Sequence, residues 1–421
     1  MNNNGYFNNN NFNNNNRAVA VANLMLCILL ECVMVKLEDL VTVYYKARAS
    51  KRRSRDSVRF EVNFKAVLLH LWKSINDRTF AAHSNYAFVV RTPKPREIFA
   101  TAMETRIIHH YLDWRLRPIY ESVLSGRSFN NRKGKGLHAA IRTYAKDIRE
   151  LSCGYTKDAW CIHLDLKGYF PNADVEIALA QQLDLIERYY EGEDKDDLKY
   201  MMTVCMRADP ARHCDIFVSK SNWDCIAPEK SLFNKPVGTG GAIGFLCWQN
   251  AMGLYINEVT KWLQSFDFLR VVVFVDDIYI ATNDKAKTLA LMPELRCRLA
   301  RLNVCLNESK FYCQHYSKGI MCLGTMLKFD RMYVSNKTVK NSVKRFSSLN
   351  IEKPLRVSLP KMLASINSTL GIFAHKTMRK TVYALCGIVE KRVGRFLERN
   401  PENNSFLIRE QFKINRLRRA A

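Results

Sequence analysis

Two adjacent aspartates, Asp276 and Asp277, lie inside the apolar stretch RVVVFVDDIYIAT at residues 270–282. Apolar and β-branched residues on both sides predict a strand, a tight turn and a second strand. Burial of two neighbouring carboxylates carries a large free-energy cost, because each charge loses its hydration and repels the other. Divalent cations would remove that cost, so the pair is a candidate metal site. A solvated hairpin turn is the alternative, although such turns usually contain Gly or Asn.

A third carboxylate occupies the same kind of position. Asp165 ends the apolar part of WCIHLDLKGYF, a predicted strand at residues 160–170. Two-metal catalysis holds its ions about 4 Å apart and needs a carboxylate from a second segment. Mg²⁺ prefers carboxylate oxygens and keeps coordination positions open for substrate phosphates. The three aspartates therefore predict a site for two Mg²⁺ ions, with Mn²⁺ as a substitute.

The composition favours a polyanionic partner. Lys and Arg number 65 against 40 Asp and Glu, a formal net charge of +25. This excess suits nucleic acid or an anionic membrane surface, and a protein with a merely basic surface is the alternative. The apolar run at residues 18–35 is interrupted by Asn23 and Glu31, so we expect no membrane span. Thirteen cysteines without a Cys-x-x-Cys pair suggest reduced thiols in a cytoplasm.

Apolar periodicity and turn residues predict a mixture of helices and strands. Residues 86–100 contain Pro93 and Pro95, which exclude helix and suit a strand–turn–strand finger. Helices are expected at about residues 35–53, 64–75, 104–116, 136–151, from 174, from the acidic patch EGEDKDD, at 242–264 and at 285–302, and through most of the chain after Val334.

The ordered motifs resemble those of reverse transcriptases, from about Leu37 to Arg379. Residues 92–110 resemble the finger motifs that grip the incoming triphosphate, and RSFNNRKGKGLHAAIR resembles the motif that contacts template. HLDLKGYF is similar to the first palm aspartate motif, and FVDD to the second, with Phe in place of the usual Tyr. LNESK places Lys310 where the family carries a palm lysine, and MCLGTM resembles the primer-grip hairpin with Cys322 at the usual Phe position.

The resemblance implies an α+β right-hand polymerase with fingers, a palm built on an antiparallel sheet, and a helical thumb. We expect an Asn-rich disordered leader at 1–35, N-terminal helices and fingers at 36–155, a palm at 156–334 with an insertion at about 190–240, and a thumb with a basic tail at 335–421. Too few residues follow the primer grip for a thumb and a nuclease, so no RNase H domain is expected. The activity implied is RNA-directed DNA polymerisation, on template RNA and RNA/DNA heteroduplex with dNTPs.

The resemblance also assigns roles to residues. Asp165, Asp276 and Asp277 would be catalytic, with Asp165, Asp276 and the Leu166 carbonyl as metal ligands and Asp277 as a supporting carboxylate. Arg96, Lys94 and Arg91 would contact the triphosphate, Phe170 would exclude a 2′-hydroxyl, Ile243 and Gln249 would border the nucleotide, and Lys310 would protonate pyrophosphate. Template and primer would be bound by Arg132, Lys133, Lys135, Lys337, Lys344 and Lys376. Plain surface cations and an ordinary core Phe are the alternatives.

Within the family, the chain resembles reverse transcriptases of diversity-generating retroelements, which carry Ile-Gly-x-x-x-Ser-Gln. Residues 243–249 are Ile-Gly-Phe-Leu-Cys-Trp-Gln, so Trp248 replaces Ser. This branch implies a bacterial or phage-encoded enzyme that copies a template-repeat RNA with errors at adenines, assisted by a small basic oligomeric accessory protein. A retron-, group II intron- or phage-defence-type enzyme is the first alternative, and an inactive nucleic-acid-binding protein is the second.

Two features bear on those errors. Ile243 stands where most relatives carry a Gln that would hydrogen-bond near the nucleotide, and an apolar residue there rejects wrong pairs less strongly. The first sixteen residues contain eleven Asn, whose codons AAC and AAT cannot become stop codons when their adenines change. We hypothesise that this leader is translated from such a template, with the working start near Met25 or Met34. A low-complexity tail is the alternative.

Overall fold

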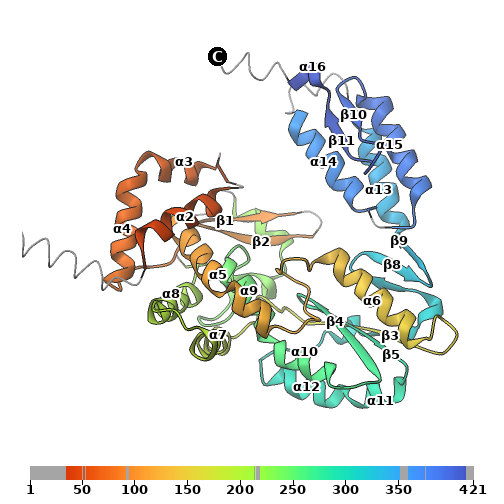
Figure 1. Ribbon diagram of the computed structural model, residues 1–421, viewed down its shortest axis with the longest axis horizontal. Coiled ribbons are helices and arrows are strands. Elements are labelled where there is room, and N and C mark those ends of the chain that lie inside the picture. The colour runs from red at the N-terminus through yellow and green to blue at the C-terminus, as the bar shows by residue number, and fades with distance from the viewer. Residues whose placement is uncertain are drawn as a thin grey trace, which may run out of the picture. The chain divides into compact units, whose positions relative to one another are not determined.

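The computed structural model describes residues 35–49, 51–52, 54–91, 94–212, 214, 219–350, 359–374 and 376–413 (Figure 1). The Asn-rich leader, apart from Val35, and the end of the basic tail lie outside these residues. The chain forms two compact units. The first contains Met1–Ser125, Gly168–Glu258 and Arg298–Cys305, and the second contains Gly126–Lys167, Val259–Cys297 and Leu306–Ala421. Within the described ranges, no helix combines the length and apolarity needed to cross a membrane.

The first unit is mainly helical. Its helices are α2 (Leu37–Arg48), α3 (Arg55–Val62), α4 (Phe64–Asn76), α5 (Met103–Val123), α7 (Val175–Tyr189), α8 (Lys195–Arg207) and α9 (Leu246–Tyr255), and α10 (Asn257–Gln264) begins in it. The helix predicted at residues 35–53 is present as α2 but is shorter, because it ends at Arg48 and the chain turns before α3 begins at Arg55. Ser54 marks that start, since its hydroxyl accepts a hydrogen bond from the Ser57 amide at 3.2 Å.

Helix α5 supplies much of the first unit's core. Its buried residues include Ile108, Leu112, Leu116 and Tyr120, which recur at four-residue spacing and form one apolar stripe. The helix continues through Pro118 to Val123, seven residues beyond the predicted end. A proline inside a helix costs about 3 kcal/mol, and the buried side chains on both sides of it offset that cost.

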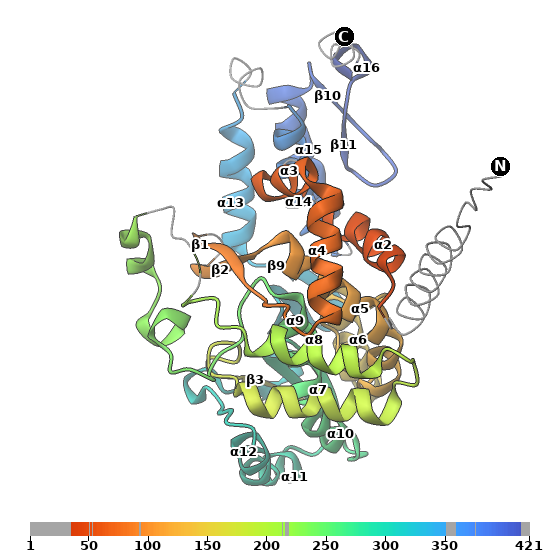
Figure 2. The same cartoon turned by 90° about the vertical axis from the view of Figure 1, so that its left-hand side faces the viewer.

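The predicted finger is present as an antiparallel hairpin of β1 (Ser84–Val90) and β2 (Arg96–Thr101), with Val90 opposite Arg96. The long loop after α8 contains three 3₁₀ turns, η1 (Lys220–Cys225), η2 (Pro228–Lys230) and η3 (Leu232–Asn234); Figure 2 draws this segment in green. The helix predicted at 242–264 is two helices, α9 and α10. The first begins only at Leu246, because Gly244 has a φ of +124°, outside the helical region.

The second unit is built on a four-stranded antiparallel sheet in the order β4-β5-β3-β6. The strands are β3 (Trp160–Asp165), β4 (Leu269–Phe274), β5 (Asp277–Thr282) and β6 (Tyr312–His315). Helix α6 (Leu137–Leu151) packs on β4 and β5 (Figure 1), where Ile141 and Tyr144 join Cys161 and Tyr279 in one core. Strand β3 ends at Asp165 rather than Phe170, because the chain turns at Gly168 with a φ of +59°.

Short helices and a second core complete this unit. The helix predicted at 285–302 is two helices, α11 (Lys285–Ala290) and α12 (Met292–Ala300); Pro293 suits the first turn of a new helix and disfavours continuation of the preceding one. Strands β7 (Ile320–Cys322), β8 (Thr325–Lys328) and β9 (Arg331–Val334) precede α13 (Asn336–Ser347), α14 (Leu359–Gly371), α15 (Arg379–Val393), the hairpin β10 (Leu397–Arg399) with β11 (Phe406–Ile408), and α16 (Glu410–Lys413). The predicted helical C-terminal region therefore also contains a hairpin, whose Phe406 closes the core around Phe346.

One buried carboxylate joins the helices of the first unit. Asp194 precedes α8, its side chain is 1% exposed, and it accepts hydrogen bonds from the Tyr111 hydroxyl at 2.8 Å, the Tyr190 hydroxyl at 2.5 Å and Arg115 at 2.9 and 2.5 Å. Burial alone would raise the pKa of Asp194, but the bonds from Arg115, Tyr190 and Tyr111 outweigh burial and lower the pKa below its ordinary value.

We expect Asp194→Ala to lower the free energy of unfolding by about 3–5 kcal/mol, because the substitution leaves the half-buried Arg115 guanidinium and the buried Tyr111 hydroxyl without their acceptor. Since the folded-state pKa is depressed, the carboxylate stabilises the protein above about pH 4, and that contribution is lost as the pH falls through the folded-state pKa. Urea unfolding at pH 7 and pH 3 measures this, and the difference between variant and wild type should shrink at pH 3. Asp196→Ala, which removes a carboxylate with 87% side-chain exposure, is the matched control; an equal loss in both variants would contradict the role of Asp194.

Candidate active site

The antiparallel register brings the three predicted carboxylates to one end of the central sheet. Asp165, the last residue of β3, pairs directly with Asp277, the first residue of β5. Asp276 lies in the turn between β4 and β5, and its carbonyl accepts a hydrogen bond from the Leu166 amide at 2.9 Å. Two segments more than a hundred residues apart therefore place Asp165, Asp276, Asp277 and Leu166 together.

The turn that carries Asp276 is strained. Only Val275 and Asp276 connect β4 to β5, and two-residue hairpin turns usually need positive φ angles that Asn and Gly tolerate best. Val275 nevertheless has a φ of +58°, which is rare for a β-branched residue. Strain of this kind costs about 1–3 kcal/mol and persists where surrounding structure imposes it. Here the apolar strands on both sides hold the turn that presents Asp276.

Asp165 is held by two polar side chains from one loop. Its side chain is 10% exposed, and Lys310 Nζ donates to Oδ1 at 2.6 Å while Asn307 Nδ2 donates to Oδ2 at 3.0 Å. The Asn307 amide also donates to the Asp165 carbonyl at 2.8 Å. Lys310 was predicted as a site residue from its motif, whereas Asn307, three positions earlier in the same motif, was missed.

His163 is a second missed residue of this site. Its Nε2 lies 2.6 Å from Oδ1 of Asp277, and its ring stacks on Tyr279 with ring centroids 4.6 Å apart. Side chains two positions apart in a strand share a face, so His163 lies on the Asp165 face of β3. A lone His within the apolar strand before Asp165 was the available sequence signal.

The electrostatics of the three aspartates suit a cation. Burial raises the pKa of Asp276, and the charges of Asp277 and Asp165 raise it further, against a smaller opposing effect of Lys310. Carboxylate oxygens are the donors that a hard divalent ion prefers. In this arrangement, however, no three His, Cys, Asp or Glu side chains within the described ranges are grouped closely enough to hold an ion. One oxygen of Asp165 is bound by Lys310, and one oxygen of Asp277 lies against His163.

The predicted triphosphate ligands lie on the hairpin of the first unit. Arg91, Lys94 and Arg96 are all exposed, and Arg91 donates to the Asn222 side chain at 2.7 Å. Thr92 and Pro93, which lie between Arg91 and Lys94 in the sequence, are outside the described residues. Arg96 and Lys94 thus present their charges to solvent at the end of the hairpin, where an anion can reach them.

The predicted nucleotide-contacting residues belong to the same unit. Ile243 and Phe170 are half-buried and Gln249 is exposed. Tyr169 is buried, and its hydroxyl donates to the Met252 carbonyl at 2.5 Å, which leaves Phe170 as the more accessible of the two rings. The substitution of Ser by Trp248 is accommodated by Gly241, because a Cβ at Gly241 would meet the buried Trp248 ring at 2.5 Å.

The predicted nucleic-acid ligands of the second unit differ in availability. Lys337 and Lys344 are exposed along α13 and Lys133 is exposed before α6. Arg132 and Lys135 are partly covered, with donor distances of 3.3 Å to the Ser128 carbonyl and 2.6 Å to the Gly126 carbonyl. Lys376 instead docks on β8, where Nζ donates to the Thr325 hydroxyl at 2.6 Å, and burial lowers the pKa of its ammonium.

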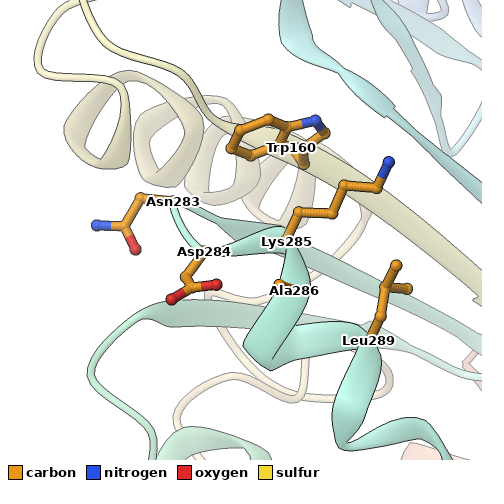
Figure 3. Close-up of a pocket in the computed structure, with 6 residues that line it drawn as sticks. All are labelled: Trp160, Asn283, Asp284, Lys285, Ala286 and Leu289. Carbon is orange, nitrogen blue, oxygen red and sulfur yellow. The ribbon is translucent and has the colours of Figure 1, made fainter.

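A shallow pocket of the second unit lies elsewhere on the sheet. It is lined by Trp160, Asn283, Asp284, Lys285, Ala286 and Leu289 (Figure 3). Trp160 is the first residue of β3 and pairs with Thr282, whereas Asp165 is the last residue of the same strand. The pocket is therefore separate from the carboxylates.

Comparison with known proteins decides the family. The model of the family described as reverse transcriptase (RNA-dependent DNA polymerase) matches residues 91–327, more than half of the chain. The chain belongs to this family. Its helices and antiparallel sheets form the right-hand polymerase fold, so the predicted fold class is confirmed, as is the prediction of a reverse transcriptase. Domains of this family generally use divalent metals, typically Mg²⁺.

Individual relatives are distant. The chain is 22% identical over 300 residues to protein YkfC of Escherichia coli (strain K12), covering 66% of this chain and 75% of that protein. Apo telomerase from Candida tropicalis shows 11% identity and a TM-score of 0.46, covering 74% of this chain and 58% of that chain. A form truncated from its C-terminal domain shows 10% identity and a TM-score of 0.42, with 62% and 59% covered. The chain thus spans less than three fifths of these telomerases, and the family assignment rests on the family model.

We expect Asp276→Asn to raise the melting temperature at pH 7 in EDTA by about 2 °C or more. The raised folded-state pKa means that the ionised carboxylate destabilises the fold at neutral pH, and the amide removes that charge. The gain should shrink as the pH falls toward about 4, where wild-type Asp276 becomes protonated. Thermal melting across this pH range, with the exposed Asp267→Asn as control, measures the effect. A variant that melts below wild type at pH 7 would contradict the repulsion.

Proposed function

We propose that this protein is an RNA-directed DNA polymerase whose chemistry takes place at Asp165, Asp276 and Asp277. The observation that carries the proposal is the strand register, which sets Asp165 opposite Asp277 beside the turn of Asp276. Three carboxylates at one sheet end, in a chain of the reverse transcriptase family with net charge +25, suit metal-dependent nucleotidyl transfer along a polyanion.

Residues of the second unit would have distinct roles in the reaction. Asp165, Asp276 and the Leu166 carbonyl would hold two Mg²⁺ ions, with Asp277 as a supporting carboxylate. The bound ions would lower the pKa of the primer 3′-hydroxyl and neutralise charge on the triphosphate. His163 orients Asp277 and Asn307 orients Asp165, at the distances given above. Lys310 Nζ, released from Asp165 Oδ1, would donate a proton to the departing pyrophosphate.

Substrate binding is assigned to both units. In the first unit, Arg96, Lys94 and Arg91 would bind the triphosphate, Phe170 would exclude a ribose 2′-hydroxyl, and Ile243 and Gln249 would border the base pair. In the second unit, Lys337, Lys344, Lys133, Arg132 and Lys135 would bind the template–primer backbone. Lys376 would join them only after leaving Thr325. The fingers, palm and thumb would be residues 36–155, 156–334 and 335–421.

Substitution of Asp165 or Asp276 by asparagine tests the proposal. Asp165→Asn and Asp276→Asn should each reduce Mg²⁺-dependent dNTP incorporation on a primed RNA template by about 10³-fold or more, since lost metal ligation removes several kcal/mol of transition-state stabilisation. Asp267→Asn, an exposed aspartate just before β4, is the matched control and should retain activity. Wild-type protein that binds the primed template without incorporating dNTPs would support the non-catalytic nucleic-acid-binding alternative instead.

A finer proposal concerns the biological role. We propose that the enzyme copies a template-repeat RNA into cDNA with errors at adenines, as in diversity-generating retroelements, with an accessory basic oligomeric protein and a bacterial or phage cytoplasm as its setting. The Ile243-Gly244 motif and the neighbouring segments support it. A retron-, intron- or defence-type enzyme would lack a template/variable repeat pair, so the DNA on either side of the gene separates these roles. A near-copy of the Asn-codon DNA at a neighbouring gene's 3′ end would likewise support the template origin of the leader.

We expect Ile243→Gln to reduce misincorporation opposite template adenine by about tenfold, because a hydrogen-bonding side chain distinguishes correct from incorrect pairs more strongly than an apolar one. Primer extension on RNA templates with adenine or another base at one position gives the error ratio. Ile372→Gln, at a site that is 45% exposed in the second unit, is the control. An unchanged error ratio at adenine would refute the role of Ile243.

A further inference from the structure

The finger hairpin carries a buried carboxylate that the mechanism above does not use. Glu97 follows Arg96 in β2 and is only 5% exposed, whereas Arg96 is exposed. One carboxylate oxygen of Glu97 accepts hydrogen bonds from Trp223 Nε1 and the Ser231 hydroxyl, both at 2.6 Å. The other oxygen accepts a bond from the Leu232 amide at 2.9 Å. All three donors come from the loop that follows α8.

We call residues 219–234 of this loop the brace. Its regular structure consists of the three 3₁₀ turns η1, η2 and η3, which have few internal hydrogen bonds and depend on outside contacts. Besides the bonds to Glu97, the Phe233 ring packs against Trp223 and Phe99, with centroid distances of 5.7 Å in both pairs. Asn222 accepts the bond from Arg91. The brace therefore contacts the hairpin through hydrogen bonds to Glu97 and Arg91 and through ring packing on Phe99.

The same hairpin is fixed to the segment that carries Ile243. The Phe99 amide donates to the Ile243 carbonyl at 2.9 Å, and the Thr101 hydroxyl donates to the Gly244 carbonyl at 3.1 Å. A Cβ at Gly244 would collide with the Phe99 carbonyl, so only glycine permits this approach. Further along, the Gly241 amide donates to the Phe170 carbonyl at 2.8 Å. One hydrogen-bonded path thus runs from the brace through the hairpin to Ile243 and Phe170.

We propose that the brace, anchored on Glu97, holds Arg96 and Ile243 in one fixed arrangement for the incoming dNTP. The inference rests on the proposed function, in which Arg96 binds the triphosphate and Ile243 borders the nascent base pair. Glu97 is then a positioning residue, because it contacts the brace and not the nucleotide. Groups that are already in place lose less conformational entropy when the nucleotide binds.

The carboxylate of Glu97 explains why the brace binds the hairpin in one defined arrangement. A two-stranded hairpin is marginally stable by itself, and an apolar residue at this buried position of β2 would allow many ways of covering it. A buried carboxylate instead requires donors in defined directions, and a missing donor carries the full cost of a lost charged hydrogen bond. The positions of Trp223, Ser231 and Leu232 are therefore fixed relative to the neighbouring Arg96.

Two variants disturb the anchor with little change of volume. In Glu97→Gln, the amide oxygen can still accept from Trp223 and Ser231, but the amide nitrogen then faces the Leu232 N–H and cannot accept its bond. Trp223→Phe removes one donor and keeps a ring beside Phe233. Glu229→Gln makes the same chemical change at an exposed carboxylate within the brace and is the matched control.

Hydrogen exchange of the amides that pair β1 with β2 is measured first, together with the melting temperature. Steady-state dNTP incorporation on a primed RNA template gives kcat and the KM for dNTP. We expect about tenfold faster hairpin exchange and about tenfold higher KM in Glu97→Gln and Trp223→Phe, with kcat within about twofold of wild type, as loss of one charged hydrogen bond predicts. Glu229→Gln should match wild type in every measurement.

Unchanged hairpin exchange in both variants would overturn the brace, and so would a lower kcat at unchanged KM, which a purely structural loss of active protein produces. The proposed function fails separately if wild type and Glu229→Gln incorporate no dNTP at all. In that case the exchange measurement, which needs no activity, still decides whether Glu97 and the brace hold the hairpin.

Discussion

Repulsion among three carboxylates at one end of an antiparallel sheet is the constraint on which the rest of the second unit depends. Asp165, Asp276 and Asp277 would separate if the backbone were free to move, because like charges repel, and burial raises the pKa of Asp276. The strands do not allow that movement. Their apolar side chains pack against α6 and the β7–β9 sheet, and the ladder hydrogen bonds fix the register that sets Asp165 opposite Asp277.

Polar side chains stabilise two of the three carboxylates by hydrogen bonding. Lys310 and Asn307 satisfy Asp165, and His163 satisfies one oxygen of Asp277. Within the described residues, Asp276 at the strained turn has no side-chain donor of this kind, and burial together with the charges of Asp277 and Asp165 raises its pKa. This asymmetry suits a site in which a cation supplies the remaining charge, since some carboxylate must keep its oxygens for the metal.

In the first unit, the charged residues Arg91, Lys94 and Arg96 are exposed on a two-stranded hairpin. Such a hairpin is only marginally stable by itself. One face of β2 is buried through Glu97, Phe99 and Thr101, and Arg96 lies on the other face. Among the helices, the buried carboxylate of Asp194 has a comparable role, because its bonds from Tyr111 and Arg115 join α5 to the start of α8. In both places a satisfied buried acid fixes geometry that apolar contacts alone would leave less defined.

Local sequence determined the chemistry and much of the element order. The apolar runs around Asp165 and Asp276 predicted strands that end in carboxylates, and Pro93 and Pro95 predicted a hairpin, because side-chain period and proline geometry act over a few residues. Tertiary structure decided what depends on distant partners. Helix α5 continues through Pro118 because its buried stripe packs on both sides. Ile243 lies outside α9 because Gly244 has a positive φ, and β2 binds the Ile243 carbonyl. His163, Asn307 and Glu97 gain their roles only from side chains or backbone that the fold brings beside them. A contact between residues a hundred positions apart leaves no periodic trace in either segment, so only folding determines it.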